Sequence, residues 1–313
     1  MSNLNIKRTV ENIRSGISIY TPITEVIVNA IQAIEERGVD NGLVGIHVVR
    51  SPQVTLDESM PEITGFTIVD NGVGFTDEHR ESFDTLYSEQ KITEGGKGFG
   101  RFTCLKYYED VNYSSHYAQD GSIWKRTFSM GKEKEIIVNE SVTEGKSDSI
   151  GTMVQLSAAK KAFPEKNLTH IARRLVEKLL PYFMSDSHPC PEILLSESDG
   201  ANPISLNKYV GSGKSALIIE SLEGKGEFVF SSKDGDRKFV VQTFKIYSPS
   251  TNRSKISLVA HRRQVQTASI HNYVPEFSEE FYDKLDDGEN NRERNFIIIV
   301  YVVGEYLDEH VSL

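Results

Sequence analysis

The chain is poor in cysteine, since only Cys104 and Cys190 of its 313 residues carry a thiol. Two isolated cysteines cannot build a disulfide framework, and they lack the spacing of metal ligands, so a reducing compartment is expected. The sequence also lacks an apolar run long enough to cross a membrane, and its first residues lack the apolar core of a signal peptide. These absences predict a cytoplasmic protein with no membrane partner.

Excess positive charge is missing as well. The 35 Lys and Arg residues are outnumbered by 45 Asp and Glu residues, which gives a formal net charge of −10. An acidic balance does not exclude nucleic acid, but the chain as a whole is no electrostatic clamp for a phosphate backbone. With 38% hydrophobic and 26% charged residues, the composition is typical of a globular protein with a sizeable core, and the length suggests two domains.

The order of predicted elements indicates an α+β fold. Strands are predicted at 45–50, 63–70, 111–119, 122–130, 134–142, 152–159 and 191–198, and helices at 21–38, 77–88, 102–110 and 168–184. From about residue 200 short strands and loops follow, with a helical stretch near 276–286 and an apolar strand at 296–304. We expect a first domain over 1–199, opening with a polar N-terminal arm at 1–20, and a smaller α+β domain over 200–313.

Residues 21–38 carry the clearest local signals for a helix. Thr21 is placed to cap the first turn, Pro22 suits the first helical position, and Gly38 suits the end of the helix. Apolar residues at helical spacing should face the core: Ile23, Val26, Ile27, Ala30, Ile31 and Ile34. A second stripe is polar and consists of Glu25, Asn29, Gln32 and Glu36. Taken alone, this stripe is either a solvated surface or one wall of a polar site.

Residues 70–74, with the sequence DNGVG, directly follow a predicted strand. An aspartate at the end of a buried strand can stay ionised and accept a hydrogen bond from an exocyclic amine. Gly72 and Gly74 would let a flat ligand approach the backbone closely. A plain turn is the alternative, because Asp-Asn-Gly is also ideal turn chemistry.

Residues 95–102, GGKGFGRF, hold four glycines in the first six positions and open a predicted helix. Glycine-rich backbone at a helix N-terminus presents unpaired N–H groups and a positive dipole end, which together favour an anion. Lys97 and Arg101 add cations within reach of a phosphate, an inference from charge and placement alone. The alternative is a mobile surface loop. The segment GSGKS at 211–215 is no P-loop, because Lys208 stands where that pattern requires a glycine.

The order of four motifs is more informative than any one of them. A helix with E-x-x-x-N-A, then DNGVGF, then GGKGFGRF, then Gly151-Thr152 at the head of a strand resembles the GHKL ATPase superfamily. Its members include gyrases, ninety-kilodalton heat-shock chaperones, histidine kinases, and MutL and MORC proteins. The resemblance covers about residues 20–155. It implies a Bergerat α/β sandwich, with helices on one face of a mixed sheet and ATP held under a lid at 91–102.

By this resemblance, Glu25 matches the general base that polarises the attacking water, and Asn29 matches the residue that holds Mg²⁺. Asp70 matches the acceptor for the adenine amine, and Thr152 the hydroxyl that supports it through water. Gln32 departs from the aspartate that many members carry. The complete set of expected ATP-binding residues, with the two inferred cations, is Asn29, Ala33, Asp70, Gly72, Val73, Gly74, Gly96, Lys97, Gly98, Phe99, Gly100, Arg101, Phe102 and Thr152. The implied cofactors are ATP and Mg²⁺.

The second half favours the branches of the superfamily that carry a transducer domain. Only about twenty residues precede the Glu25 helix, where histidine kinases place phosphoacceptor helices. Residues 255–265 resemble the transducer strand with a basic turn, in which Arg262 and Arg263 are either surface charge or phosphate contacts. Residues 302–313 resemble the segment that leads to the catalytic arginine of the chaperone branch. We therefore expect the sequence to be part of a longer protein.

The expected function is an ATP-operated clamp. ATP with Mg²⁺ would order the lid, closure would favour a homodimer through the N-terminal arm, and slow hydrolysis would release it. A role in prokaryotic defence or DNA maintenance follows by analogy of architecture alone. Two other functions stay open, a chaperone-like machine that remodels proteins and a nucleotide sensor that does not hydrolyse ATP. A protein or nucleic acid partner would be bound through a region beyond Leu313.

Overall fold

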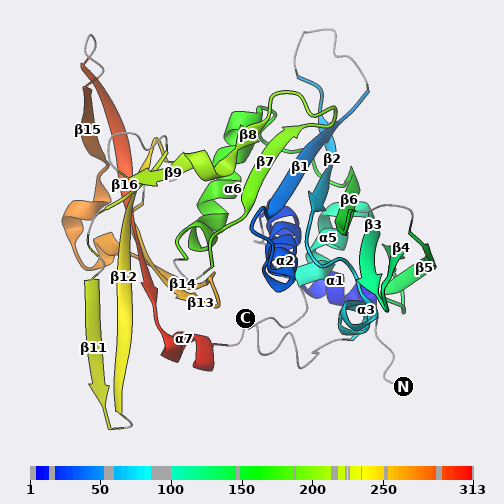
Figure 1. Ribbon diagram of the computed structural model, residues 1–313. Helices are drawn as coiled ribbons and strands as arrows, with labels where there is room; N and C mark the ends of the chain where they lie inside the picture. The colour runs from blue at the N-terminus through cyan, green and yellow to red at the C-terminus, as the bar shows by residue number, and fades with distance from the viewer. Residues whose placement is uncertain are drawn as a thin grey trace. The chain divides into compact units, whose positions relative to one another are not determined.

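The computed structural model describes residues 5–13, 18–52, 60–85, 100–145, 149–185, 188–212, 218–222, 224, 226–233, 235–249, 253–286 and 291–311. The chain divides into two compact units (Figure 1). The first comprises residues 1–179 and 186–206, and the second residues 180–185 and 207–313. Helices and mixed sheets together make the fold α+β, which confirms the predicted class.

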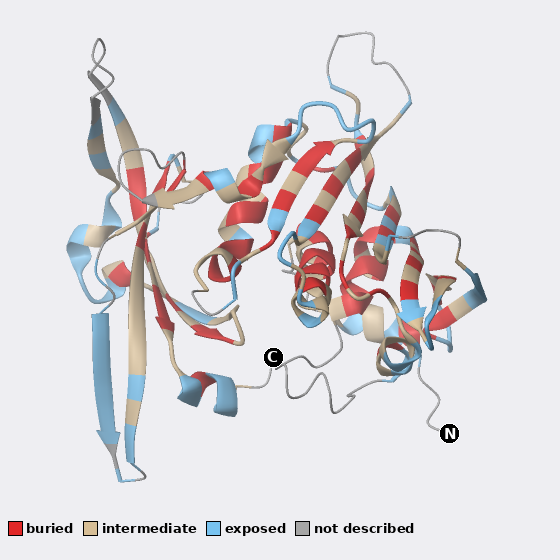
Figure 2. Cartoon of the chain, viewed as in Figure 1, coloured by how far each residue is buried: buried red, intermediate tan, exposed pale blue. Residues whose placement is uncertain are grey.

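The first unit is built on an eight-stranded sheet with the order β5-β4-β3-β6-β2-β1-β7-β8. Its strands are β1 Leu43–Arg50, β2 Ile63–Asp70, β3 Tyr108–Gln119, β4 Ser122–Met130, β5 Ile137–Glu144, β6 Gly151–Ala159, β7 Glu192–Glu197 and β8 Ile204–Ser205. Neighbouring strands are antiparallel except β1 and β7, which run parallel. Buried positions alternate with less buried ones along β1 (Figure 2), so one face of the sheet carries the core.

Helices cover this core face. The helices that precede β7 are α1 Ile6–Asn12, α2 Thr21–Arg37, α3 Asp77–Asp84, α5 Gly100–Tyr107 and α6 Leu168–Phe183. Helix α2 packs on β1, β2 and α5, and α5 packs on β3, so α2 and α5 lie on the same face. The helix predicted at 102–110 ends earlier, because Tyr108 already pairs with β6 as the first residue of β3. No helix in the described part of the chain is long and apolar enough to cross a membrane.

Helix α2 follows its sequence pattern closely. Its buried side chains include all six predicted core positions, Ile23, Val26, Ile27, Ala30, Ile31 and Ile34. Gly38 ends the helix with a φ of +66°, the left-handed conformation that glycine tolerates. The predicted cap is wrong, because Thr21 is itself the first helical residue and Tyr20 before it makes no side-chain bond to the first turn.

The second unit is a strand-rich sheet with the order β14-β13-β16-β12-β10-β9, to which β11 adds on β12 and β15 on β16. Its strands are β9 Val210–Ser212, β10 Ile219–Ser221, β11 Gly226–Ser232, β12 Gly235–Tyr247, β13 Lys255–Ala260, β14 Arg263–Ser269, β15 Phe281–Asp286 and β16 Asn291–Val303, and helix α7 Glu305–His310 follows. The apolar β16 is central, since it pairs antiparallel with β12 and β15 and parallel with β13.

The helix predicted near 276–286 is wrong. The structure has a 3₁₀ turn over Pro275–Ser278 and then the strand β15. Phe281 of β15 lies opposite Phe296 of β16, and the two rings stack with centroids 5.6 Å apart. Pairing with an apolar neighbouring strand has overridden the local helical signal, as tertiary context often does.

The basic turn predicted within 255–265 joins β13 to β14. His261 and Arg262 have φ angles of +47° and +58°, as a two-residue hairpin turn of the primed type requires. The guanidinium of Arg262 lies over the ring of Tyr182, 4.8 Å from its centroid. One of the two basic side chains of this turn therefore stacks on an aromatic ring.

Truncating Ile27 to alanine tests the core beneath α2. Ile27 is 0% exposed, so the Ile27→Ala variant loses packing and leaves a cavity, and its free energy of unfolding in urea should fall by about 2–5 kcal/mol. The control is Glu36→Ala on the exposed side of the same helix, where the contact of its carboxylate with Nε2 of His79 is worth about 1 kcal/mol at most. Equal stability of Ile27→Ala and the unmodified chain would refute the assignment of this core.

Candidate functional site

Asp70 lies at the end of β2 and is 9% exposed. Its Oδ1 accepts hydrogen bonds from the backbone N–H of Gly72 at 2.8 Å and of Thr152 at 3.3 Å. The carboxylate thus ties the loop after β2 to the head of β6. The second oxygen, Oδ2, accepts no hydrogen bond from any residue that the structure describes.

Burial raises the pKa of Asp70 from its ordinary value of 3.8 to about 6. The two backbone hydrogen bonds and the positive charge of Arg37 act in the opposite direction. The carboxyl group is therefore mostly ionised at neutral pH, although little water surrounds it. A desolvated carboxylate with one oxygen available is a strong acceptor for an N–H donor.

The loop after β2 lies directly against α2. A Cβ on Gly72 would be 2.6 Å from the Cβ of Ala33 and 2.7 Å from its carbonyl carbon. The N–H of Val73 donates to the carbonyl of Ala33 at 3.0 Å. Gly74 has a φ of +83°, and a Cβ there would be 2.3 Å from the carbonyl oxygen of His116. Both glycines are therefore required by close backbone contacts.

Thr152 is positioned by the backbone of Gly151 and by Ser115. A Cβ on Gly151, whose φ is +151°, would be 2.0 Å from the carbonyl oxygen of Asp70. The hydroxyl of Thr152 lies 3.0 Å from that of Ser115, which is fully buried and donates to the carbonyl of Gly151 at 3.0 Å. Ser115 also accepts the N–H of Phe75 at 2.8 Å, so one hydroxyl links β3, β6 and the loop after β2.

Arg37, like Ser115, is a residue of this site that the sequence did not indicate. Its Nη1 donates to the carbonyls of Asn71 at 2.7 Å and Ile150 at 3.2 Å, so it joins the same two loops as Asp70 does. An arginine in the last turn of a helix is common, as is a serine within a strand. No sequence signal therefore separates Arg37 or Ser115 from ordinary surface or core residues.

Glu25 lies two turns before Ala33 on α2, close to the start of α5. A Cβ on Gly100, the first residue of α5, would be 2.3 Å from Oε2 of Glu25 and 2.8 Å from its Cδ. The carboxylate therefore lies against the backbone where α5 begins. Glu25 and Ala33 are about 12 Å apart along the helix axis. Two predicted motifs thus contact α2 at two points along its length.

Asn29 lies one turn from Glu25 on α2 and is half-buried. Within the described ranges, no group of three or more His, Cys, Asp and Glu side chains could hold a metal ion. Mg²⁺ does not need such a cage, because it usually keeps several waters and takes one or two protein oxygens beside substrate phosphates. One amide with a carboxylate nearby fits that requirement.

Arg101, which was predicted to contact a phosphate, has its side chain in the interior of the first unit. Its side chain is 4% exposed and donates to the backbone carbonyls of Phe83 and, at 2.9 Å, of Thr85. The guanidinium also lies over the Phe83 ring, and burial lowers its pKa to about 10. Arg101 therefore fastens α5 to the end of α3. Phe102 is 0% exposed, so its ring lies in the core and lines no open surface.

Four predicted ATP-binding residues, Gly96, Lys97, Gly98 and Phe99, lie outside the described residues. Of the predicted lid at 91–102, the structure describes the three residues from Gly100 onward. At this end of the candidate site, the described contact is the one between Glu25 and Gly100.

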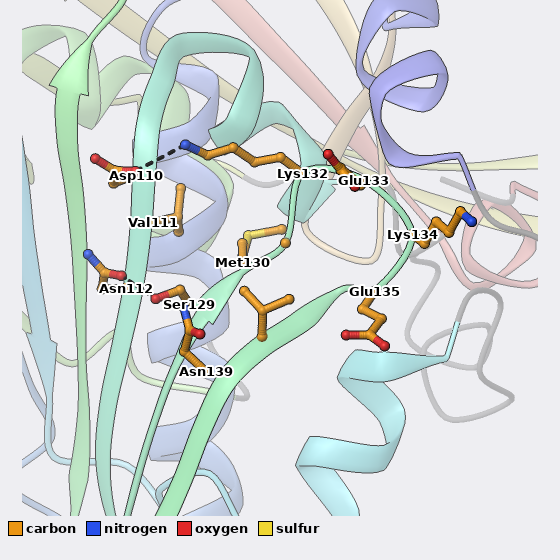
Figure 3. Close-up of a pocket in the computed structure, with 12 residues that line it drawn as sticks. Asp110, Val111, Asn112, Ser129, Met130, Lys132, Glu133, Lys134, Glu135 and Asn139 are labelled. Atoms are coloured by element: carbon orange, nitrogen blue, oxygen red, sulfur yellow. Dashed lines mark hydrogen bonds and ion pairs between the residues drawn. The ribbon is translucent and has the colours of Figure 1, made fainter.

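A separate hollow of about 560 Å³ lies beside β3, β4 and the start of β5 (Figure 3). It contains none of the residues predicted to bind ATP. Lys132 pairs with Asp110 at 3.1 Å, and Ser129 donates to Asn112 at 2.6 Å. We assign no chemistry to this hollow.

Comparison with known proteins gives little further information. No protein-family model matches the chain, and no curated protein matches it. Among solved structures, it is similar to the N-terminal domain of a DNA repair protein, with a TM-score of 0.49 and 12% identity. That similarity covers 95% of this chain and 86% of the other chain. A likeness this distant carries no conclusion about activity.

Replacing Asp70 with asparagine should stabilise the protein in the absence of a ligand. Folding raises the pKa of Asp70 to about 6, so the ionised carboxylate reduces stability progressively as the pH rises from about 4 to above 6. The amide of the Asp70→Asn variant keeps an acceptor for Gly72 and Thr152 but carries no charge. We expect a gain of up to about 3 kcal/mol at pH 8 that shrinks toward pH 4.

Urea unfolding at several pH values measures this gain. The control is Asp120→Asn, in the exposed turn between β3 and β4, where asparagine tolerates the φ of +53° equally well. Its stability should follow that of the unmodified chain at every pH. A loss of stability in Asp70→Asn that is largest at pH 8 would contradict the assigned burial of the charge.

Proposed function

We propose that the first unit binds ATP with Mg²⁺ and hydrolyses it slowly, in the manner of the GHKL ATPases that its motif order resembles. One observation carries the proposal: segments far apart in the sequence meet along one helix. Ala33 of α2 contacts Gly72 and Val73, and Glu25 of the same helix contacts Gly100. Next to the contact between Ala33 and Gly72, Oδ1 of Asp70 accepts a hydrogen bond from the backbone N–H of Thr152.

The end of the site near Asp70 suits an adenine base. The backbone N–H groups of Gly72 and Thr152 donate to Oδ1 of Asp70 and so fix the orientation of the carboxylate. Its Oδ2 would accept the exocyclic amine, which is a charge-assisted hydrogen bond in a site with little water. The hydroxyl of Thr152, which lies beside Ser115, would support the base through water. Gly72 and Gly74 let the loop that carries this end of the site lie directly against α2 and β3.

The end near Glu25 suits the phosphates. The first turn of α5 offers backbone N–H groups and the positive end of a helix dipole. Glu25 would take a proton from the attacking water as general base, and Asn29 would offer a neutral oxygen to Mg²⁺. Bound Mg²⁺ would supply charge neutralisation for the phosphate oxygens. A nucleotide sensor that does not hydrolyse ATP would use the same contacts, so the Glu25→Ala variant distinguishes the two.

In this proposal, ATP hydrolysis resets a conformational switch. ATP would close the lid at 91–102, closure would favour a homodimer through the N-terminal arm, and hydrolysis would open it again. A chaperone-like machine that remodels proteins would use the same nucleotide site, so it remains the second candidate. A role in prokaryotic defence or DNA maintenance is proposed from the architecture alone.

Replacing Glu25 with alanine tests the proposed hydrolysis. Without a general base the rate of phosphate release should fall by about 10²–10⁴-fold, while ATP affinity changes little, because the base does not hold the nucleotide. Phosphate release is followed with a coupled assay, and binding with a fluorescent ATP analogue. The Glu36→Ala variant is the matched control, since Glu36 lies on the same helix but pairs with His79. It should hydrolyse ATP at the normal rate.

Unchanged phosphate release in Glu25→Ala would refute the role of Glu25 as base. Loss of both binding and hydrolysis in that variant would also contradict the proposal, since it would show that Glu25 holds the nucleotide. A chain that binds ATP but releases no phosphate, with or without Glu25, would instead favour the sensor.

The proposed adenine contact also predicts a pH dependence of ATP binding. Because the pKa of Asp70 is about 6, protonation below pH 6 removes the charged acceptor and affinity should fall as the pH is lowered through this value. Asp70→Asn should bind ATP about 100-fold more weakly at pH 7.5. Isothermal titration calorimetry from pH 5 to pH 8 measures both effects.

The phosphates of ATP titrate in the same range, so Asp70→Asn provides the baseline for this experiment. The pH dependence of the unmodified chain should exceed that of the variant. Normal ATP affinity in Asp70→Asn, together with an identical pH profile, would refute the adenine contact.

A further inference from the structure

Strand β11 forms an open edge of the second unit. Among the described residues it pairs with β12 alone, from Gly226 opposite Val241 to Ser232 opposite Gly235. The pairing of β16 with β12 ends at Val240. Beyond that residue the hairpin of β11 and β12 extends as a two-stranded ribbon (Figure 1). One backbone edge of this ribbon belongs to β11 and is open over the strand's length.

The ribbon exposes three consecutive large apolar side chains. Phe228, Val229 and Phe230 are 45%, 57% and 60% exposed, and β11 is drawn as exposed along its length in Figure 2. Phe228 stacks on Phe239 of β12 with centroids 5.1 Å apart, which covers one side of one ring. An isolated two-stranded ribbon is marginally stable in water, and an apolar edge strand is a template for another strand. These features indicate a contact surface.

The pairing register determines which backbone groups of β11 point outward. The hairpin closes with Ser232 opposite Gly235, and the closing pair of a two-residue hairpin exchanges both of its hydrogen bonds. Every second residue of β11, counted back from Ser232, therefore bonds to β12. Glu227, Val229 and Ser231 instead direct their N–H and C=O groups to the open edge.

We propose that β11 pairs antiparallel with β11 of a second copy of this chain, about a two-fold axis through Val229. Val229 is the midpoint of the seven-residue strand Gly226–Ser232, so this register gives the fullest overlap. Val229 then bonds to its counterpart, and Glu227 to Ser231 of the second copy. Phe228 lies opposite Phe230 of the second copy, in the closer, non-hydrogen-bonded pairs that suit aromatic rings.

The charges on β11 favour a second copy of this chain as its pairing partner. The one charged residue of β11, Glu227, faces an uncharged serine in this register, and Lys238 of the same hairpin already pairs with it at 2.8 Å. No like charges therefore meet across the axis. A strand with one acidic and no basic residue offers little to a nucleic acid backbone. A strand that complements itself is what an isologous two-fold interface requires.

Mass measurement on the full chain without nucleotide tests the pairing separately from any ATP-driven dimer. Seven paired residues make a small interface, so association should appear in the micromolar range or above, as a rise from 35.2 kDa toward twice that mass. Sedimentation equilibrium over a concentration series gives the dissociation constant. Val229→Lys and Val229→Glu should each weaken the dimer by roughly tenfold or more, because like charges then meet on the axis.

An equimolar mixture of Val229→Lys and Val229→Glu should restore the dimer, since opposite charges meet only if the axis passes through Val229. The matched control is the same pair of substitutions at Val142, which is 44% exposed on the edge strand β5 of the first unit. These should leave the mass unchanged.

Three outcomes would overturn the proposal. The chain could stay monomeric at every concentration, which would leave β11 to another partner. It could dimerise regardless of the substitutions at Val229. The mixture could remain dissociated although each variant is folded by circular dichroism, which would place the axis elsewhere.

Discussion

The close contact between Ala33 and Gly72 is the constraint on which the first unit depends. Less than a normal van der Waals separation would remain if Gly72 carried a Cβ, so backbone meets helix directly at this point. This contact sets how far α2 lies from the loop after β2. Helix geometry then fixes where Glu25 lies, two turns away, and so which part of α5 it meets. Gly72 therefore sets how closely the loop approaches α2, and the helix sets the spacing between the two ends of the candidate site.

Next to this contact, two buried polar side chains and one partly buried arginine hold two loops together. Asp70, Arg37 and Ser115 reach the backbone on both sides of the junction between the loop after β2 and the head of β6. Apart from the contact between the hydroxyls of Ser115 and Thr152, these bonds join side chains to main-chain groups. Such a junction is rigid, and a rigid acceptor loses little entropy when a ligand docks. The desolvation of Asp70 is the corresponding cost to folding.

Local patterns allowed much of this fold to be predicted from the sequence. The apolar periodicity of α2 identified its buried face, and the β-branched residues of β2 identified the strand that carries Asp70. Long-range pairing could not be predicted in this way. Residues 281–286 form a strand because β16 lies beside them, and Arg101 is buried because the carbonyls of Phe83 and Thr85 accept its hydrogen bonds. Arg37 and Ser115 act through backbone partners more than 30 residues away, which no local pattern encodes.

The parallel pairing of β1 with β7 has a consequence for synthesis. Gly45 pairs with Leu194, 149 residues later in the chain, so β1 has one edge open until residue 197 has left the ribosome. Contacts this distant in sequence slow folding, because a long loop must close before they form. During that interval the unpaired backbone edge of β1 is accessible to other nascent chains. Chaperones that bind exposed strands would improve the yield of folded protein.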